Sequence, residues 1–173
     1  KAYVLDDSKD QNSWYERLIA SASSNTENTA YTRAANTSTY AALLSIALGI
    51  GDPKELALAG LLHDIGLTAV KPEEYEQHPI VSVRLIRERR MSVSEKVCSI
   101  IEQHHERFDG SGFPEKLPGP KVIKEAQILQ IADMLDELTR IKDGYPRVLV
   151  GEAVERICEE GLRNPMASAI NPE

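Results

Sequence analysis

The four histidines of the chain stand where a metal ion could use them. His63 is followed directly by Asp64. His104 and His105 are adjacent to each other, and His78 precedes a proline. Imidazole and carboxylate ligands without a thiolate favour iron, manganese, zinc or another borderline metal over a structural zinc knuckle. These residue types therefore indicate a transition-metal centre.

The adjacent pairs also indicate how many ions the centre holds. Neighbouring residues on a helix point in directions about 100° apart, so His63–Asp64 and His104–His105 fit poorly around one small ion. The two pairs fit better when they flank a pair of ions. A further carboxylate, Asp133, lies on or beside the apolar face of a predicted helix, where a hydrophobic residue is expected.

Each of these residues also has an ordinary structural interpretation. A lone His or Asp on an apolar face is usually hydrogen bonded in the core, and a cationic His63 would suit the end of a helix. His78 could simply mark a helix boundary. However, burying His104, His105 and Asp133 in one core without a metal would carry a desolvation cost that their mutual hydrogen bonds offset only in part. The coincidence of all four histidines favours the metal.

Helices must position these residues, because the hydrophobic periodicity is helical almost throughout and only 5% of the residues are aromatic. We predict an all-α domain. Its clearest helix start is at Asp52, where Asp52 can cap, Pro53 fits the first helical position and Glu55 has capping-box spacing. The predicted helices span residues 13–22, 52–64, 79–90, 92–106, 122–140 and 152–160.

The N-terminal part is less regular. Residues 21–40 include 12 Ser, Thr or Asn, which lowers helix propensity and predicts a linker or a poorly packed first helix. We also predict that this segment is the most mobile part of the domain. Residues 1–7 resemble a lone strand, and residues 1–24 are interpreted as an N-terminal segment or the stump of an upstream regulatory domain.

Composition excludes several classes of protein. With 20 Lys and Arg against 27 Asp and Glu, the net charge of -7 argues against binding to polymeric nucleic acid. No apolar stretch approaches the roughly 20 residues of a membrane span. Cys98 and Cys158 lie within apolar helical patterns, and residues 1–10 lack the apolar region of a signal peptide. We therefore expect a cytoplasmic protein of 173 residues with one main domain.

The candidate residues form an ordered series of motifs. The series consists of His63-Asp64-Ile65-Gly66, His78-Pro79, His104-His105-Glu106, Asp109-Gly110-Ser111-Gly112-Phe113-Pro114 and Asp133. It resembles the HD-GYP domain, a group within the HD superfamily of metal-dependent phosphohydrolases, and residues 25–173 are assigned to that domain. The resemblance implies an HD-superfamily helical bundle with a buried binuclear metal site that hydrolyses cyclic di-GMP.

Carried over residue by residue, the resemblance implies which side chains bind the metals and the substrate. Asp64 would be the bridging ligand and the catalytic residue, and two ions, iron or alternatively manganese or zinc, would acidify a water for attack on the phosphodiester. Glu106 or Asp136 could orient the imidazoles, with solvated surface charge as the alternative for Glu106. The implied metal ligands are His63, Asp64, His78, His104, His105 and Asp133, and the implied substrate-binding residues are Ser111, Phe113 and Arg147.

The chain departs from the family pattern at several positions. Leu67 replaces a lysine that could neutralise a substrate phosphate, and Phe113 replaces the tyrosine of the motif name and so removes a hydroxyl. Glu27 and Tyr31 resemble a Glu-x-x-x-His pair with Tyr in place of His, which implies two ions rather than three. The segment from Leu67 to the second motif is short, which indicates a deleted loop or a missing stretch of residues.

These observations leave three functions open. The first is a cyclic di-GMP phosphodiesterase with weak or altered activity. The others are a catalytically degenerate HD-GYP module for nucleotide sensing or partner docking, and an HD phosphohydrolase of another nucleotide. The expected partners are cyclic di-GMP or a related small nucleotide, an upstream sensory domain, and a protein at the glycine-rich loop of residues 108–120, which could also be only a connection.

Overall fold

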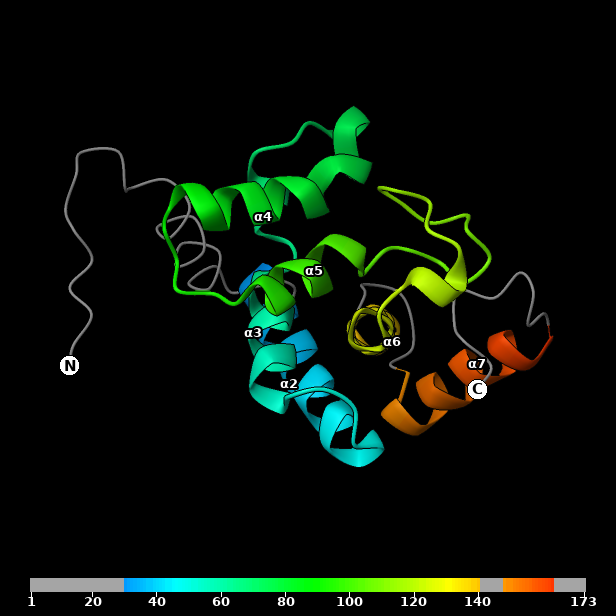
Figure 1. The fold of residues 1–173 in the computed structure, drawn as a ribbon. Helices are drawn as coiled ribbons and strands as arrows, with labels where there is room; N and C mark the ends of the chain where they lie inside the picture. Colours follow the sequence, from blue (N-terminus) through cyan, green and yellow to red (C-terminus); the bar gives the residue numbers. More distant parts are fainter. Residues whose placement is uncertain (1–29, 141–147, 164–173) are drawn as a thin grey trace.

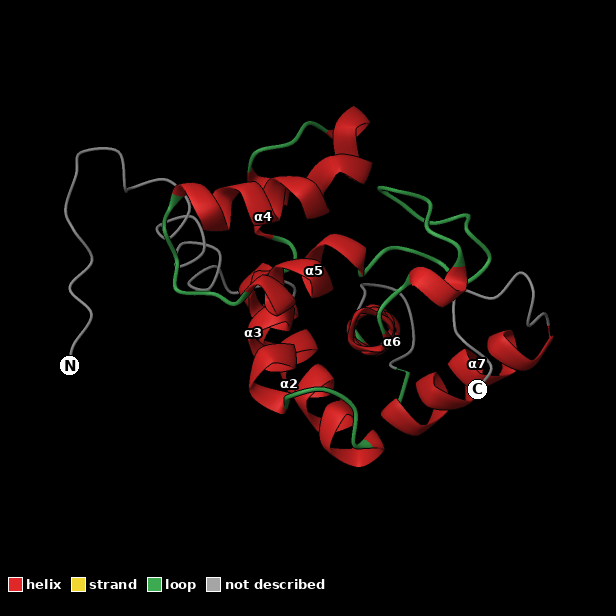
Figure 2. Cartoon of the chain, viewed as in Figure 1, coloured by secondary structure: helices red, strands yellow, loops and turns green. Residues whose placement is uncertain are grey.

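The computed structural model describes residues 30–140 and 148–163, and these residues form helices joined by turns, with no strand among them (Figure 2). The predicted all-α fold is confirmed. The predicted strand at residues 1–7, the predicted helix at 13–22 and the domain boundary after residue 24 lie outside the described residues.

Within residues 30–140 and 148–163, six α-helices carry the fold. Helix α6 is seen end-on in Figure 1, with α2 and α3 on one side of it and α7 on the other. Helix α5 packs against α3, α4 and α6. None of the described helices is long and apolar enough to cross a bilayer. The bounds are α2 (Ala30–Leu48), α3 (Pro53–Leu62), α4 (His78–Glu88), α5 (Glu95–Gln103), α6 (Lys124–Thr139) and α7 (Val150–Arg163), with 3-10 turns at Ile65–Thr68, Pro72–Gln77 and Gly119–Lys121.

The main core lies between α3, α5 and α6. Leu56, Ile100, Ile101 and Leu129 are completely buried there. Each such side chain stabilises the fold by about 1.5 to 3 kcal/mol relative to an exposed position. This packing fixes the three helices relative to one another, and candidate ligands lie just after α3, just after α5 and within α6.

Local capping explains where α3 and α5 begin. Asp52 accepts a hydrogen bond from the Lys54 amide at 2.8 Å, as predicted. The Glu55 carboxylate does not complete a capping box but accepts from the Ser94 hydroxyl at 2.7 Å. Ser94 in turn caps α5 by accepting from the Val97 amide. This cap is why α5 begins at Glu95, three residues later than predicted.

Residues 21–40 are predicted to be a linker or a poorly packed first helix; from residue 30 on they form a helix, so the linker alternative is wrong there, and the helix is well packed. Residues 30–40 belong to helix α2, where Ala34 and Thr37 are buried. The small residues serve a close contact with α3, because a Cβ at Gly60 would lie 2.6 Å from Ser38 Cα. The Ser38 hydroxyl also donates to the Ala57 carbonyl at 2.8 Å. Small polar side chains here allow tight packing, which composition alone does not distinguish from a linker.

Other helix ends differ by a few residues from the prediction. Helix α3 ends at Leu62, and after His63 and Asp64 the chain enters the 3-10 turn Ile65–Thr68. Helix α6 begins at Lys124 after the 3-10 turn Gly119–Lys121, rather than at residue 122. Helix α7 is longer than predicted at both ends.

Candidate metal centre

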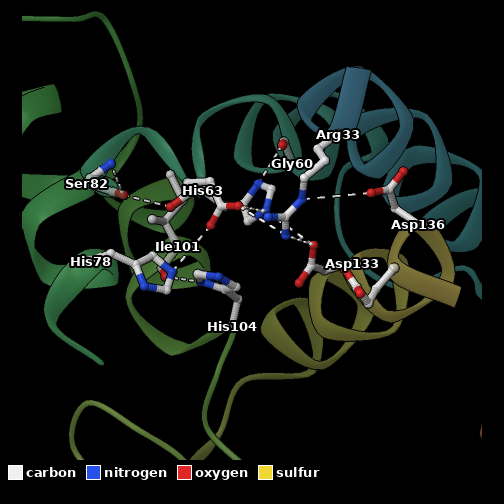
Figure 3. A network of polar contacts seen from close by, with 12 residues as sticks. Arg33, Gly60, His63, His78, Ser82, Ile101, His104, Asp133 and Asp136 are labelled. Carbon is white, nitrogen blue, oxygen red and sulfur yellow. Dashed lines mark hydrogen bonds and ion pairs between the residues drawn. The ribbon is translucent and has the colours of Figure 1, made fainter. Parts of the chain in front are cut away.

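Four separate segments converge on one buried point (Figure 3). His63 follows α3, His78 is the first residue of α4, and His104 follows α5. Asp133 comes from the middle of α6. The three imidazoles are completely buried, and the side chain of Asp133 is 15% exposed. Residues distant in sequence are therefore brought together by three helix ends and the middle of α6, which the core holds in place.

Each of the three buried imidazoles is oriented by a backbone carbonyl three residues earlier. The Nδ1 atoms of His63, His78 and His104 lie 2.7 Å from the carbonyl oxygens of Gly60, Tyr75 and Ile101 respectively. Since a carbonyl only accepts, each Nδ1 must donate, and Nε2 is turned toward the centre. Within the described part of the chain, none of these Nε2 atoms has a hydrogen-bond partner.

Asp64 bridges the two ends of the cluster. Its Oδ1 lies 3.3 Å from His78 Nε2, and its Oδ2 lies 3.3 Å from His63 Nε2. His63 Nε2 also lies 3.5 Å from Asp133 Oδ1. The ligand atoms of Asp64, His78, His104 and His105 all lie within 4.8 Å of one another. Asp64 therefore contacts both ends of the centre. We call His78, His104 and His105 the histidine-rich end, and His63 with Asp133 form the other end.

The turn after Asp64 is fixed by contact with helix α4. The Gly66 amide donates to the Ser82 hydroxyl at 2.8 Å, and that hydroxyl donates to the His63 carbonyl at 2.7 Å. A Cβ at Gly66 would lie only 2.2 Å from the His78 carbonyl oxygen, so glycine is required by this close approach. The glycine of the motif therefore allows the His63–Asp64 pair to meet the start of α4.

The environment sets different protonation states for the ligands. Burial lowers the pKa of His105 to about 4, and burial together with His105 and His63 lowers the pKa of His104 well below its usual range. Burial also disfavours charge on His63, but Asp64 and Asp133 outweigh it and raise the pKa of His63 to about 10. Without a metal, His104 and His105 are therefore neutral, and His63 holds a proton.

The two carboxylates remain ionised in this environment. Burial opposes the charge on Asp64, yet His63, His78 and Arg33 hold its pKa well below the usual range. The pKa of Asp133 is lowered in the same way, against burial, by His63 and Arg33. Neutral imidazoles and ionised carboxylates are the forms that bind metals.

These observations fit a bound metal better than a metal-free core. Three buried Nε2 atoms turned toward one point lack the hydrogen bonds that buried polar atoms normally make. A divalent cation would bind these Nε2 atoms, displacing the proton that His63 holds without a metal, and would be held by imidazole and carboxylate donors. The described residues thus contain a His/Asp cluster of the kind able to hold a metal ion, while the number and identity of the ions stay predictions.

The buried Glu106 side chain anchors the glycine-rich loop through hydrogen bonds to its backbone. This residue is 2% exposed, and its carboxylate accepts from the Glu115 and Leu117 amides at 2.6 and 2.8 Å. The Phe113 amide donates to the His105 carbonyl at 3.1 Å, and the Phe113 ring lies 4.6 Å from the His105 ring. The alternative of a solvated surface charge for Glu106 is therefore wrong, and its carboxylate orients a loop rather than an imidazole.

The remaining predicted site residues are less directly connected. The Ser111 hydroxyl donates to Asp109 Oδ1 at 2.6 Å on the exposed loop. Asp136 is buried and accepts from Asn36 and Arg140, so it also orients no imidazole. Arg147 and Glu27 lie outside the described residues, and Tyr31 is exposed on α2.

Two residues that the sequence analysis missed lie at the centre. Arg33 donates to Asp133 Oδ1 at 3.1 Å. It was missed because it falls in the segment interpreted as a linker. The Tyr75 ring lies 4.8 Å from the His78 ring and 5.8 Å from the Phe113 ring. Tyr75 lies in the short stretch before the second motif, where no periodic pattern indicated its position.

A cavity of about 330 Å³ opens beside the centre. Its volume falls within the range of small-molecule sites, and its wall combines candidate ligands with two arginines and several apolar side chains. The lining residues are His104, His105, Arg107, Gln130, Asp133, Met134, Glu137, Leu138, Arg156 and Ile157.

The fold and the cluster together define a helical domain built around a candidate metal site. A family model described as "HD domain" matches residues 15–163. The chain therefore belongs to the HD domain family.

Similar proteins agree with this assignment. The chain is 32% identical over 128 residues to a cyclic di-GMP phosphodiesterase of Pseudomonas aeruginosa, covering 65% of this chain and 31% of that protein. It is 32% identical over 110 residues to 3'3'-cGAMP-specific phosphodiesterase 1 of Vibrio cholerae, covering 56% of this chain and 25% of that protein. The chain thus spans less than a third of the length of these relatives.

A solved structure is also similar. The HDG"Y"P protein from Bdellovibrio bacteriovorus matches with a TM-score of 0.61 and 25% identity, over 83% of this chain and 49% of that chain. Together with the relatives, it confirms the predicted resemblance to HD-GYP domains.

Proposed function

We propose that the chain is a metal-dependent phosphodiesterase that acts on a cyclic dinucleotide, either cyclic di-GMP or a close relative such as 3'3'-cGAMP. The observation that carries this proposal is the convergence of Asp64, His78, His104 and His105, with ligand atoms within 4.8 Å of one another. The names of the similar proteins support the substrate class.

The donor set could serve two ions, with Asp64 contributing to both. One ion would be held by Asp64 with His78, His104 and His105, and the other by Asp64 with His63 and Asp133. When bound, the ions would act as Lewis acids on the phosphoryl group and acidify a water molecule. Asp64 would bind both ions. The three histidines whose Nδ1 atoms donate to backbone carbonyls would keep their Nε2 atoms directed at the ions. Iron is the expected metal, with manganese and zinc as alternatives.

The cavity would hold the nucleotide beside the ions. Arg107 and Arg156 line its wall together with Asp133 and Glu137, and guanidinium groups are suited to phosphate oxygens even though Arg156 also pairs with Glu152 at 2.6 Å. The Phe113 ring, packed on His105, would offer a face on which a base can stack. Ser111 and Arg147 stay candidate substrate contacts. The unpaired thiols Cys98 and Cys158 suit the cytoplasm as the site of action.

A second candidate is a catalytically degenerate HD-GYP module that senses a nucleotide or docks a partner, either through an upstream sensory domain or at the glycine-rich loop. The observation that favours it is Leu67, which follows Gly66 in the 3-10 turn Ile65–Thr68 and has no charge for a substrate phosphate. An HD phosphohydrolase of another nucleotide is the remaining alternative.

Hydrolysis of cyclic di-GMP and 3'3'-cGAMP by the manganese- or iron-loaded chain, followed by chromatography of the products, tests the proposal. We expect slow turnover of at least one nucleotide. Asp64→Asn should abolish it, whereas Glu73→Gln, which removes one negative charge at an exposed position, should not. If the metal-loaded chain hydrolyses neither nucleotide, or if Asp64→Asn leaves turnover unchanged, the phosphodiesterase proposal fails.

A further inference from the structure

A guanidinium group lies at the carboxylate end of the candidate metal centre (Figure 3). Arg33 Nη2 is 3.1 Å from Asp133 Oδ1 and 3.3 Å from Asp64 Oδ2. The Arg33 side chain comes from the first turns of α2 and is 27% exposed. A protein cation is therefore built into the site at which a metal ion would be held.

Arg33 and His63 contact the same two oxygen atoms, Asp64 Oδ2 and Asp133 Oδ1. His63 Nε2 lies 3.3 Å from Asp64 Oδ2 and 3.5 Å from Asp133 Oδ1. An ion held by His63, Asp64 and Asp133 would have to share those oxygens with the guanidinium. Each carboxylate oxygen has lone pairs for more than one partner, so sharing is possible, but the two cations would repel each other.

The position of Arg33 is restricted by its neighbours. Its Nε lies 3.9 Å from Asp136 Oδ2, a longer separation than those of Nη2. Both oxygens of Asp136 are already engaged, by Asn36 Nδ2 at 2.9 Å and by Arg140 Nη2 at 2.9 Å. Asp136 therefore cannot readily draw the guanidinium away from Asp64 and Asp133.

The two ends of the centre consequently differ in charge. The histidine-rich end combines the Asp64 carboxylate with the imidazoles of His78, His104 and His105. The other end combines two carboxylates with a guanidinium that stays protonated at any ordinary pH. A divalent ion that binds at the His63–Asp133 end is repelled by the Arg33 guanidinium, which already contacts both carboxylates there. At the histidine-rich end, the guanidinium contacts none of the imidazole ligands.

We propose that Arg33 is a built-in cation that weakens metal binding at the His63–Asp133 end, so that the centre fills in two steps, with the histidine-rich end first. This inference rests on the proposed metal centre. Arg33 is then a positioning residue that holds the Asp64 and Asp133 carboxylates in place before the second ion binds. The same positive charge makes the ion at the His63–Asp133 end dissociate more readily than the ion at the histidine-rich end.

Titration of the metal-free chain with Mn²⁺ tests the proposal, with bound ions counted by calorimetry and paired ions detected by electron paramagnetic resonance. We expect two separated binding steps for the natural sequence, and a second step about tenfold or more tighter in Arg33→Gln, because a direct charge repulsion is removed. Arg140→Gln is the matched control. It also removes one arginine, but Arg140 contacts Asp136 and Glu137 rather than the shared oxygens.

A second measurement does not depend on a variant folding. With one equivalent of Mn²⁺, the natural sequence should give the signal of an isolated ion, without the signal of a coupled pair. A coupled pair at this ratio would overturn the proposal. So would an Arg33→Gln second step that is unchanged or weaker, or one that Arg140→Gln reproduces. If no Mn²⁺ binds to the natural sequence, the metal centre itself fails, and this inference with it.

Discussion

Replacing Glu106 with Gln should loosen the glycine-rich loop from the candidate centre. The Glu106 carboxylate is buried and accepts from two loop amides, those of Glu115 and Leu117. A glutamine of the same shape keeps one oxygen but presents an NH₂ group to the other amide. One charge-assisted hydrogen bond is lost and a donor is left without an acceptor, which together cost about 3 kcal/mol.

For a chain of this size, that loss corresponds to a fall in Tm of about 6 to 12 °C. Differential scanning calorimetry measures the fall, and hydrogen exchange should show faster exchange at Glu115 or Leu117. Glu115→Gln is the matched control, because it removes the same charge from an exposed position on the same loop. Unchanged protection of both amides in Glu106→Gln would refute the claim that this carboxylate anchors the loop.

Three further predictions concern packing, charge and substrate. Gly60→Ala should destabilise the domain by about 1 to 3 kcal/mol in urea unfolding, because its Cβ would meet the Ser38 backbone; Gly151→Ala, whose Cβ would meet nothing within 4 Å, should not. In metal-free protein, burial opposes charge on His63 but its two carboxylate neighbours raise its pKa to about 10. Its contribution to stability is therefore present below the unfolded pKa of about 6.5 and is lost as pH rises toward 10, so Tm should fall across this window; an equal fall in His63→Gln would contradict this. Leu67→Lys combined with Phe113→Tyr should raise kcat/KM for cyclic di-GMP or tighten its binding, since a charge-assisted phosphate contact contributes about 1.5 to 3 kcal/mol; no gain in either quantity would count against this substrate.

Much of the fold could be predicted because its signals are local. The Asp52 cap and Pro53 mark the start of α3, and helical periodicity indicates α4 to α7 in approximately the right places. The spacing of the histidines and Asp133 also predicts which residues the structure brings together. These features could be predicted because capping residues and hydrophobic periodicity are local sequence patterns.

The features that escaped prediction depend on contacts between distant segments. Helix α2 is rich in Ser, Thr and Asn, and only its close approach to α3 explains why those small side chains are favourable there. Arg33 reaches residues on two other segments, and nothing adjacent to it in sequence indicates that. Glu106 resembles a surface charge until the returning loop is placed above it.

The most direct test of the account is an anomalous difference map from crystals of the chain grown with Mn²⁺ and measured near the manganese absorption edge. The account predicts a strong peak bounded by Asp64, His78, His104 and His105, with a second peak between His63 and Asp133 that is weaker when metal is limiting. Absence of any peak among the first four residues, with manganese bound elsewhere or not at all, would contradict the assignment of this cluster as a metal centre.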